Sequence, residues 1–243
     1  MRIRVLTVFP DQFDSFQNHP LTARAIRKHL LDLEIIDLKE YADGSFRHID
    51  DSPYGGGAGM ILRCEPVYRA LANCRTPKSR VIAFTPGGTV YNQKTARRLL
   101  EEPDLIFICG HYEGMDERIL ETVDEEISVG DFILSGGELP AMTVMDSLIR
   151  LLEGTIRPDS TAEESFENGL LEYPQYTRPA SFEGMDVPEV LRSGHRENIR
   201  RWRLKQSLKK TMEKRPDLLE NRPLTDEEEA LLEEIRDEEL EGN

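Results

Sequence analysis

Two glycine-bearing loops between residues 105 and 138 carry the clearest chemical signal in the sequence. The apolar run Leu105–Ile108 ends in Cys109-Gly110-His111-Tyr112-Glu113-Gly114, and the run from Ile127 to Leu134 ends in Ser135-Gly136-Gly137-Glu138. Short apolar runs bounded by turn residues predict buried strands. Glycine after a strand permits a sharp turn or a close approach of backbone to a ligand. Because ligands of open α/β sheets bind beyond the carboxyl ends of strands, the pair predicts a small-molecule site built largely from backbone.

The elements that must position these loops alternate along the chain. Helical spacing is expected at residues 21–31, 65–72 and 92–102, and a further helix is expected to begin at Pro140. Strands are expected at residues 2–9, 34–38, 80–84, 105–108 and 127–134. Strands alternating with helices predict an α/β domain with a mainly parallel sheet.

A polar stretch without periodicity divides the chain. We expect a first domain at residues 1–157, a flexible linker at 158–170 and a small helical domain at 171–243. Helices are expected at 195–214 and 225–240, the second opened by a capping box between Thr225 and Glu228.

Charge is distributed unevenly over the 243 residues. The formal net charge of −15 argues against nucleic acid as a partner of the whole chain, but basic residues cluster between 192 and 215 and acidic residues between 226 and 241. Local clustering therefore leaves an RNA-binding surface open, and the acidic end is expected to be a solvated face or tail.

Cysteine usage and hydropathy indicate a compartment. Cys64, Cys74 and Cys109 are odd in number and lack metal-ligand spacing, which favours free thiols in a reducing cytoplasm. No long apolar segment predicts a membrane span, and the N-terminus lacks the apolar region of a signal peptide. We therefore expect a cytoplasmic protein with no membrane partner.

A third glycine-rich stretch, residues 50–60, reads DDSPYGGGAGM. It is neither a Walker loop nor a dinucleotide-binding fingerprint, and composition alone favours a flexible turn. Together with TPGG at 85–88, GHYEG at 110–114, VGDFILSGG at 129–137, LRSGH at 191–195 and IRRWR at 199–203, it closely resembles the bacterial tRNA (guanine-37-N1)-methyltransferases of the SPOUT superfamily. The resemblance runs from Phe9-Pro10 to Leu224-Thr225.

This resemblance implies a fold and an activity. The fold is a mainly parallel sheet with a deep C-terminal trefoil knot, joined to a small all-α C-terminal domain. The activity is methyl transfer from S-adenosylmethionine to N1 of the guanosine 3′ of the tRNA anticodon, position 37, which supports reading-frame maintenance. The family also implies a homodimer whose active site is shared between subunits, and a magnesium dependence for which no carboxylate cluster here indicates a site.

Binding residues are carried over from the matching strings. The loops expected to hold the cofactor contain Thr85, Pro86, Gly110, Tyr112, Glu113, Ser128, Val129, Gly130, Phe132, Leu134, Ser135, Gly136, Gly137 and Pro140. The residues expected to meet tRNA are Asp50, Gly55, Gly57, Gly59, Ser165, Arg192, His195, Arg200, Arg201 and Lys205.

The reaction needs a base and a cation. Guanine N1 must lose its proton, and charge then grows on the O6 side. The resemblance assigns the cation to Arg150, although Asp146 four residues earlier also suits a simple surface ion pair. It assigns the base to Glu164, where the family usually has aspartate; Glu163 and Glu172 are weaker candidates.

Two other functions stay open at this point. The glutamate at 164 is compatible with a tRNA-binding relative of weak or absent activity. The glycine loops alone are compatible with a different α/β nucleotide-binding enzyme. Binding of S-adenosylmethionine would favour the methyltransferase or its inactive relative over a different nucleotide-binding enzyme. Turnover on tRNA would then separate the methyltransferase from the inactive relative.

Overall fold

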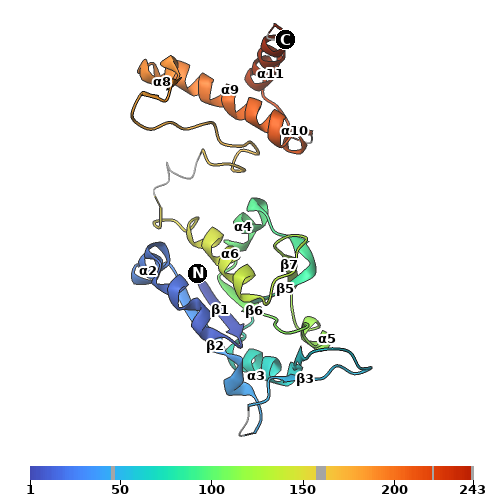
Figure 1. The fold of residues 1–243 in the computed structure, drawn as a ribbon. Helices are drawn as coiled ribbons and strands as arrows, with labels where there is room; N and C mark the ends of the chain where they lie inside the picture. Colours follow the sequence, from blue (N-terminus) through green and yellow to red (C-terminus); the bar gives the residue numbers. More distant parts are fainter. Residues whose placement is uncertain (45–46, 157–162, 221, 242–243) are drawn as a thin grey trace. The chain divides into compact units, whose positions relative to one another are not determined.

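The computed structural model describes residues 1–44, 47–156, 163–220 and 222–241 (Figure 1). The chain forms two compact units, Met1–Arg157 and Pro158–Asn243. None of the helices in the described ranges is long and apolar enough to cross a bilayer.

A five-stranded parallel sheet forms the centre of the first unit. Its strands are β1 (Arg2–Thr7), β2 (Asp32–Asp37), β5 (Ser79–Val90), β6 (Asp104–Ile108) and β7 (Glu125–Ser128), in the order β2-β1-β6-β5-β7. Every pairing is parallel. The central strand β6 is buried throughout, as expected for a strand covered on both faces. The predicted α/β fold with a mainly parallel sheet is confirmed.

Helices cover the two faces of this sheet because alternate side chains of each strand enter different cores. One core takes Ile82, Leu105 and Phe107 and packs against α2, α4 and α6; the other takes Val81 and Ile106 and packs against α3 and α5. The helical segments of the unit are η1 (Pro10–Phe13), α1 (Asp14–Asn18), α2 (Pro20–Arg27), η2 (Leu38–Tyr41), α3 (Cys64–Cys74), α4 (Gln93–Leu99), α5 (Glu117–Leu120) and α6 (Glu138–Ile149). A small hairpin joins β3 (Asp50–Asp51) to β4 (Ile61–Leu62).

Three expected boundaries near the glycine loops are wrong. The strand expected at 127–134 ends at Ser128, and the apolar residues after it leave the sheet: Phe132 is 57% exposed and Ile133 80% exposed. Strand β5 continues past Phe84 to Val90, with a register shift between Phe84 and Thr89 that leaves residues 85–88 as a bulge. Helix α6 begins at Glu138, two residues before Pro140.

A buried ion pair fixes the end of the sheet away from the loops. Arg4 bonds both carboxylate oxygens of Asp104 and the Cys74 carbonyl, and Ser79 donates to Asp104. Burial raises the pKa of the Asp104 carboxyl, but the hydrogen bonds from Ser79 and Arg4 outweigh that effect, and its pKa lies below the ordinary value. Asp104 is therefore ionised at neutral pH.

Asp104→Ala should destabilise the protein by about 3–5 kcal/mol, because it leaves the Arg4 charge buried without its partner. Urea denaturation followed by circular dichroism measures this, with Asp43→Ala, which removes an exposed pair with Arg69, as the control of little effect. Since the folded pKa is depressed, the stabilisation is complete above the ordinary value of about 3.9 and is lost as pH falls through the folded value. A wild-type stability equal to that of Asp104→Ala at neutral pH would contradict this account.

The second unit is mainly helical. Its elements are β8 (Ser181–Phe182), β9 (Met185–Asp186), α8 (Glu189–Arg192), α9 (Arg196–Lys214), α10 (Asp217–Glu220) and α11 (Asp226–Glu241). The antiparallel pair β8–β9 is an addition to the expected all-helical composition. Leu208 of α9 and Leu231, Leu232 and Ile235 of α11 form its core with Leu170, the last residue of the expected linker.

The two expected helices of this unit begin differently. The Thr225 amide donates to Glu228 Oε2 at 2.9 Å, and the Glu228 amide donates to Thr225 Oγ1 at 3.3 Å, which is the expected capping box. His195 occupies the N-cap position of α9 without a capping bond from its side chain, and its own amide donates to Ser193 Oγ at 3.2 Å.

Candidate functional site

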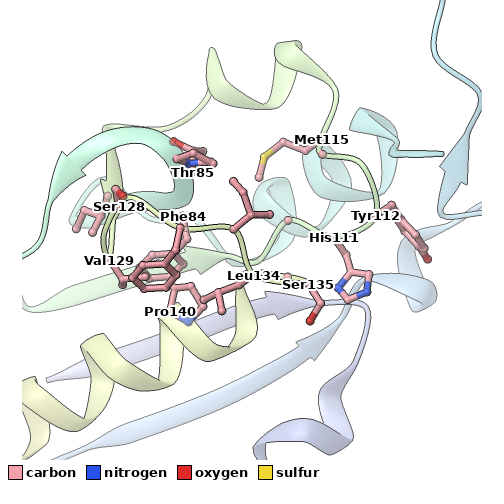
Figure 2. Close-up of a pocket in the computed structure, with 18 of the residues that line it drawn as sticks. Phe84, Thr85, His111, Tyr112, Met115, Ser128, Val129, Leu134, Ser135 and Pro140 are labelled. Atoms are coloured by element: carbon pink, nitrogen blue, oxygen red, sulfur yellow. The ribbon is translucent and has the colours of Figure 1, made fainter. Parts of the chain in front are cut away.

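A cavity of about 340 Å³ lies in the first unit, beside the bulge after Phe84 in β5 and at the ends of β6 and β7 (Figure 2). Three segments line it: residues 84–86, 110–115 and 127–137, joined by Leu120 and Pro140. All fourteen residues that the family resemblance assigned to the cofactor border this one cavity. The sheet brings them together because β6 and β7 end at the same edge of the parallel sheet, where β5 carries its bulge.

The two central loops are held against each other by backbone. The Gly137 amide donates to the Gly110 carbonyl at 2.8 Å, and His111 forms a β-bridge with Gly136. A Cβ at Gly137 would lie 2.7 Å from Cys109 Cα, although the φ of Gly137, −81°, is open to any residue. Glycine is therefore required at 137 by the proximity of the neighbouring backbone, not by its own conformation.

A buried carboxylate, that of Glu138, lies close to both loops. Glu138 is 1% exposed; it accepts a hydrogen bond from Thr7 Oγ1 at 2.7 Å, and its Oε2 lies 3.6 Å from His111 Nδ1. The His111 ring packs against Phe9 at 4.5 Å between centroids. Glu138 and His111 thus connect the end of β1, through Thr7, to both glycine loops.

Cys109 is a potential nucleophile directly before Gly110 of the cavity lining, and its surroundings make it inert. Burial raises the pKa of the Cys109 thiol well above its ordinary value, and the Glu138 carboxylate adds to that shift. A protonated, fully buried thiol is a poor nucleophile. The cavity is therefore suited to binding and positioning rather than to covalent catalysis by cysteine.

Sequence reasoning missed part of the lining. The unassigned residues are Phe84, His111, Gly114, Met115, Leu120, Ile127 and Ile133. Most are apolar, so nothing in their type separates them from core residues. Their places at strand ends beside glycine loops were the available signal; Figure 2 shows Phe84, Met115 and His111 around the same hollow as Val129 and Leu134.

The glycine-rich stretch 50–60 is attached to the rim of the cavity. The Glu113 amide donates to the Met60 carbonyl at 3.0 Å, and the Leu62 amide donates to the Gly114 carbonyl at 3.0 Å. Burial raises the pKa of Tyr112, and the negative charges of Asp50 and Glu138 add to that shift. The expected substrate glycines at 55, 57 and 59 all have positive φ, and Tyr54, directly before them, is fully exposed.

The expected catalytic pair is divided between the units. Arg150 is the C-terminal cap of α6 in the first unit. Glu164 lines a hollow of about 480 Å³ in the second unit, together with Asn168, Tyr173 and Arg203.

The two weaker candidates for the base, Glu163 and Glu172, each form hydrogen bonds within the second unit. Glu163 accepts a hydrogen bond from the Tyr173 hydroxyl at 2.6 Å and lies 3.4 Å from Arg203. Burial, and then the bond to Glu163, raise the pKa of Tyr173 to about 12. The Glu172 carboxylate accepts from the Gln175 amide nitrogen, and the Glu172 backbone amide donates to Ser165 Oγ at 2.9 Å.

The expected RNA-facing cations lie at the start of α9 and just before it. Arg192 ends α8, His195 caps α9, and both are partly or largely exposed. Arg200, Arg201 and Lys205 are exposed to different degrees and form ion pairs with glutamates. No group of three or more His, Cys, Asp or Glu side chains in the described residues is arranged to hold a metal ion.

The sheet is parallel, and its glycine loops enclose a cavity at one edge. This arrangement is typical of α/β proteins that bind small molecules. Its family follows from sequence comparison. The family model described as tRNA (Guanine-1)-methyltransferase TrmD matches residues 1–221. The chain belongs to this family, and it is an enzyme of that class.

Individual relatives agree over nearly their whole length. A tRNA (guanine-N(1)-)-methyltransferase of Streptococcus thermophilus is 50% identical over 239 residues, which cover 98% of this chain and 99% of the relative. One of Streptococcus agalactiae is 51% identical, covering 98% and 95%. One of Streptococcus sanguinis is 52% identical over 237 residues, covering 97% and 98%.

Proposed function

We propose that the cavity of the first unit binds S-adenosylmethionine and that the enzyme transfers its methyl group to N1 of the guanosine at position 37 of tRNA. The observation that carries the proposal is the convergence of the three family-matching loops on one cavity. The modification would support maintenance of the reading frame, in the cytoplasm.

The residues present fit such a cofactor. Backbone from the 110–115 and 128–137 loops supplies hydrogen-bonding groups, and Leu120, Ile127 and Leu134 supply apolar walls. A cavity of about 340 Å³ lies within the usual range of ligand pockets, about 300–1,000 Å³. The glycines at 110, 136 and 137 let the loops approach without side chains filling the space between them.

The cofactor would supply an electrophilic methyl group, and the protein would supply alignment and proton transfer. Glu164 would accept the proton of guanine N1, which is needed before that nitrogen can attack. Arg150 would stabilise the charge that develops on the O6 side. Positioning of the two substrates would account for a large part of the rate.

The same proposal covers the finer architecture. We assign residues 1–157 to the cofactor-binding unit, 158–170 to the linker and 171–243 to the tRNA-binding unit. The three loops would form the trefoil knot of the SPOUT superfamily; their mutual backbone contacts and the double pairing of Ile127 with Phe84 and Thr89 support this reading. The magnesium requirement remains a prediction, and no residue is assigned to it.

We expect a homodimer in the absence of RNA. Phe132 and Ile133 at the cavity rim and Leu139 on α6 are largely exposed apolar side chains, as an interface requires. The family completes its active site across two chains. Light scattering at micromolar protein should give twice the chain mass of 27.9 kDa. A monomer mass together with full activity would overturn the shared-site arrangement.

Two measurements test the proposed function against its alternatives. Calorimetry with S-adenosylmethionine should show binding, with ATP and NAD as comparison ligands. Preferential binding of ATP or NAD would favour another nucleotide-dependent enzyme. Labelled methyl transfer to purified tRNA should then show turnover; cofactor binding without transfer would instead favour a tRNA-binding protein with an inactive site.

A further inference from the structure

The acidic helix α11 lies against the basic helix α9 in the second unit (Figure 1) and pairs with its cations. Arg200 Nη2 lies 2.5 Å from Glu227 Oε1, and Lys205 Nζ lies 2.7 Å from Glu238 Oε1 and 3.2 Å from Glu234 Oε2. Arg201 pairs with the other oxygen of Glu234. Arg200, Arg201 and Lys205, three of the residues expected to meet RNA, are thus each paired with a carboxylate of α11, and Arg200 also pairs with Glu197 of α9.

The carboxylates are not what holds α11 in place. Leu231, Leu232 and Ile235 of α11 are buried against Leu208 of α9, and the capping box fixes the start of the helix. Ten of the sixteen residues of α11 are acidic, and the family model ends at residue 221, before the helix begins. Apolar packing therefore anchors a dense row of negative charge beside α9.

The two arginine pairs with α11 are weak enough to exchange. Arg200, Arg201, Glu227 and Glu234 are each 40–50% exposed, and exposed ion pairs contribute little because water and salt screen them. Lys205 is only 15% exposed, so its pairs are screened less. An RNA phosphate and a glutamate carboxylate offer the same kind of acceptor to a guanidinium. A phosphate can take over such a cation only by displacing a carboxylate that stays nearby and repels it.

We propose that Glu227, Glu234 and Glu238 act as an internal competitor for RNA phosphates, which limits sequence-independent RNA binding to α9. This inference rests on the proposed function, because it assumes that Arg200, Arg201 and Lys205 contact RNA. The competitor acts on phosphate contacts, which carry no sequence information, so it weakens cognate and unrelated RNA alike. Other contacts, such as those to the target guanosine, must then provide the preference for tRNA.

The test compares two charge-matched variants of the full-length protein. The competitor variant is Glu227→Gln/Glu234→Gln/Glu238→Gln. The control variant is Glu229→Gln/Glu233→Gln/Asp237→Asn, which removes the same charge from exposed α11 positions that form no described ion pair with α9. Because both variants change the net charge equally, their difference isolates the local competition from long-range attraction.

Fluorescence anisotropy should show the competitor variant binding both tRNA and poly(U) on the order of tenfold more tightly than the control variant. Its affinity should also fall more steeply with salt. Equal affinities of the two variants would overturn the proposal. Weaker RNA binding with a lowered unfolding midpoint would also overturn it, because the pairs would then be structural.

A third variant separates this inference from the proposed function. Arg200→Gln/Arg201→Gln/Lys205→Gln should weaken tRNA binding and leave S-adenosylmethionine affinity unchanged. If it does so while the competitor and control variants have equal tRNA affinities, the assignment of the RNA-binding surface is supported and the proposed competition is refuted. If it binds tRNA as the wild type does, the RNA surface itself is misplaced, and the competitor falls with it.

Discussion

Glu164→Gln should lower the single-turnover rate of methyl transfer by about a hundred- to ten-thousandfold, the usual range for a general base. Glutamine keeps the shape of the side chain and removes its basicity. Because the interaction strengthens only as the N1 proton leaves, tRNA affinity should be nearly unchanged. Rapid-quench methylation with enzyme in excess, together with an equilibrium binding measurement, separates the two effects.

The neighbouring Glu163 provides the matched control. Its carboxylate is held by Tyr173 and Arg203, so Glu163→Gln should leave the chemical step close to that of the wild type. Glu164→Asp restores the usual family residue and should remain active, since the two carboxylates differ only slightly in ordinary pKa, about 3.9 against 4.3. If Glu164→Gln reacts at the wild-type rate, the base is another residue, and loss of rate in Glu163→Gln would identify it.

Arg150→Ala should reduce the same single-turnover rate by a similar factor, through loss of the charge that stabilises O6. Its effect should again fall on the chemical step and not on cofactor affinity. A reduction confined to cofactor binding would contradict the role assigned to Arg150.

Gly137→Val should weaken S-adenosylmethionine binding about ten- to a hundredfold. The added side chain would begin 2.7 Å from Cys109 Cα and 3.0 Å from the Gly110 nitrogen, both backbone atoms that cannot move without opening the loop pair. Overpacking of this kind costs about 1–3 kcal/mol, and each 1.4 kcal/mol is tenfold in affinity. Titration calorimetry on the folded variant measures the change.

Gly87→Ala is the control for this substitution. Gly87 belongs to the first loop but does not line the cavity, and a Cβ there would meet nothing within 4 Å. Cofactor affinity should therefore be retained. Unchanged affinity in Gly137→Val would move the cofactor away from the junction of the two loops.

The sheet was predictable from sequence because its strands are short apolar runs separated by turn residues. The run Leu105–Ile108 is buried on both faces and was placed to within one residue. The strand predicted from Ile127 to Leu134 was too long, because the apolar residues Phe132 and Ile133 line the cavity rim and are not packed in the core. A run of apolar residues does not show whether its side chains are buried in the core or line a binding site.

The cavity was predictable only with help from the family resemblance. Glycine spacing indicated loops at strand ends, but the contact between Gly137 and Cys109 joins segments that no local rule relates. The pairing of Arg200, Arg201 and Lys205 with α11 was missed for the same reason. Basic and acidic stretches were each visible in the sequence, whereas the helical packing that brings them together depends on Leu208 and Ile235.

The most direct test of the account is to map the methylated nucleoside on tRNA. Wild-type enzyme, S-adenosylmethionine and a tRNA with guanosine at position 37 should yield 1-methylguanosine at that position alone. The same tRNA with adenosine at 37 should receive no methyl group. Methylation at another position or another atom, or equal transfer to the adenosine-37 tRNA, would contradict the proposed reaction.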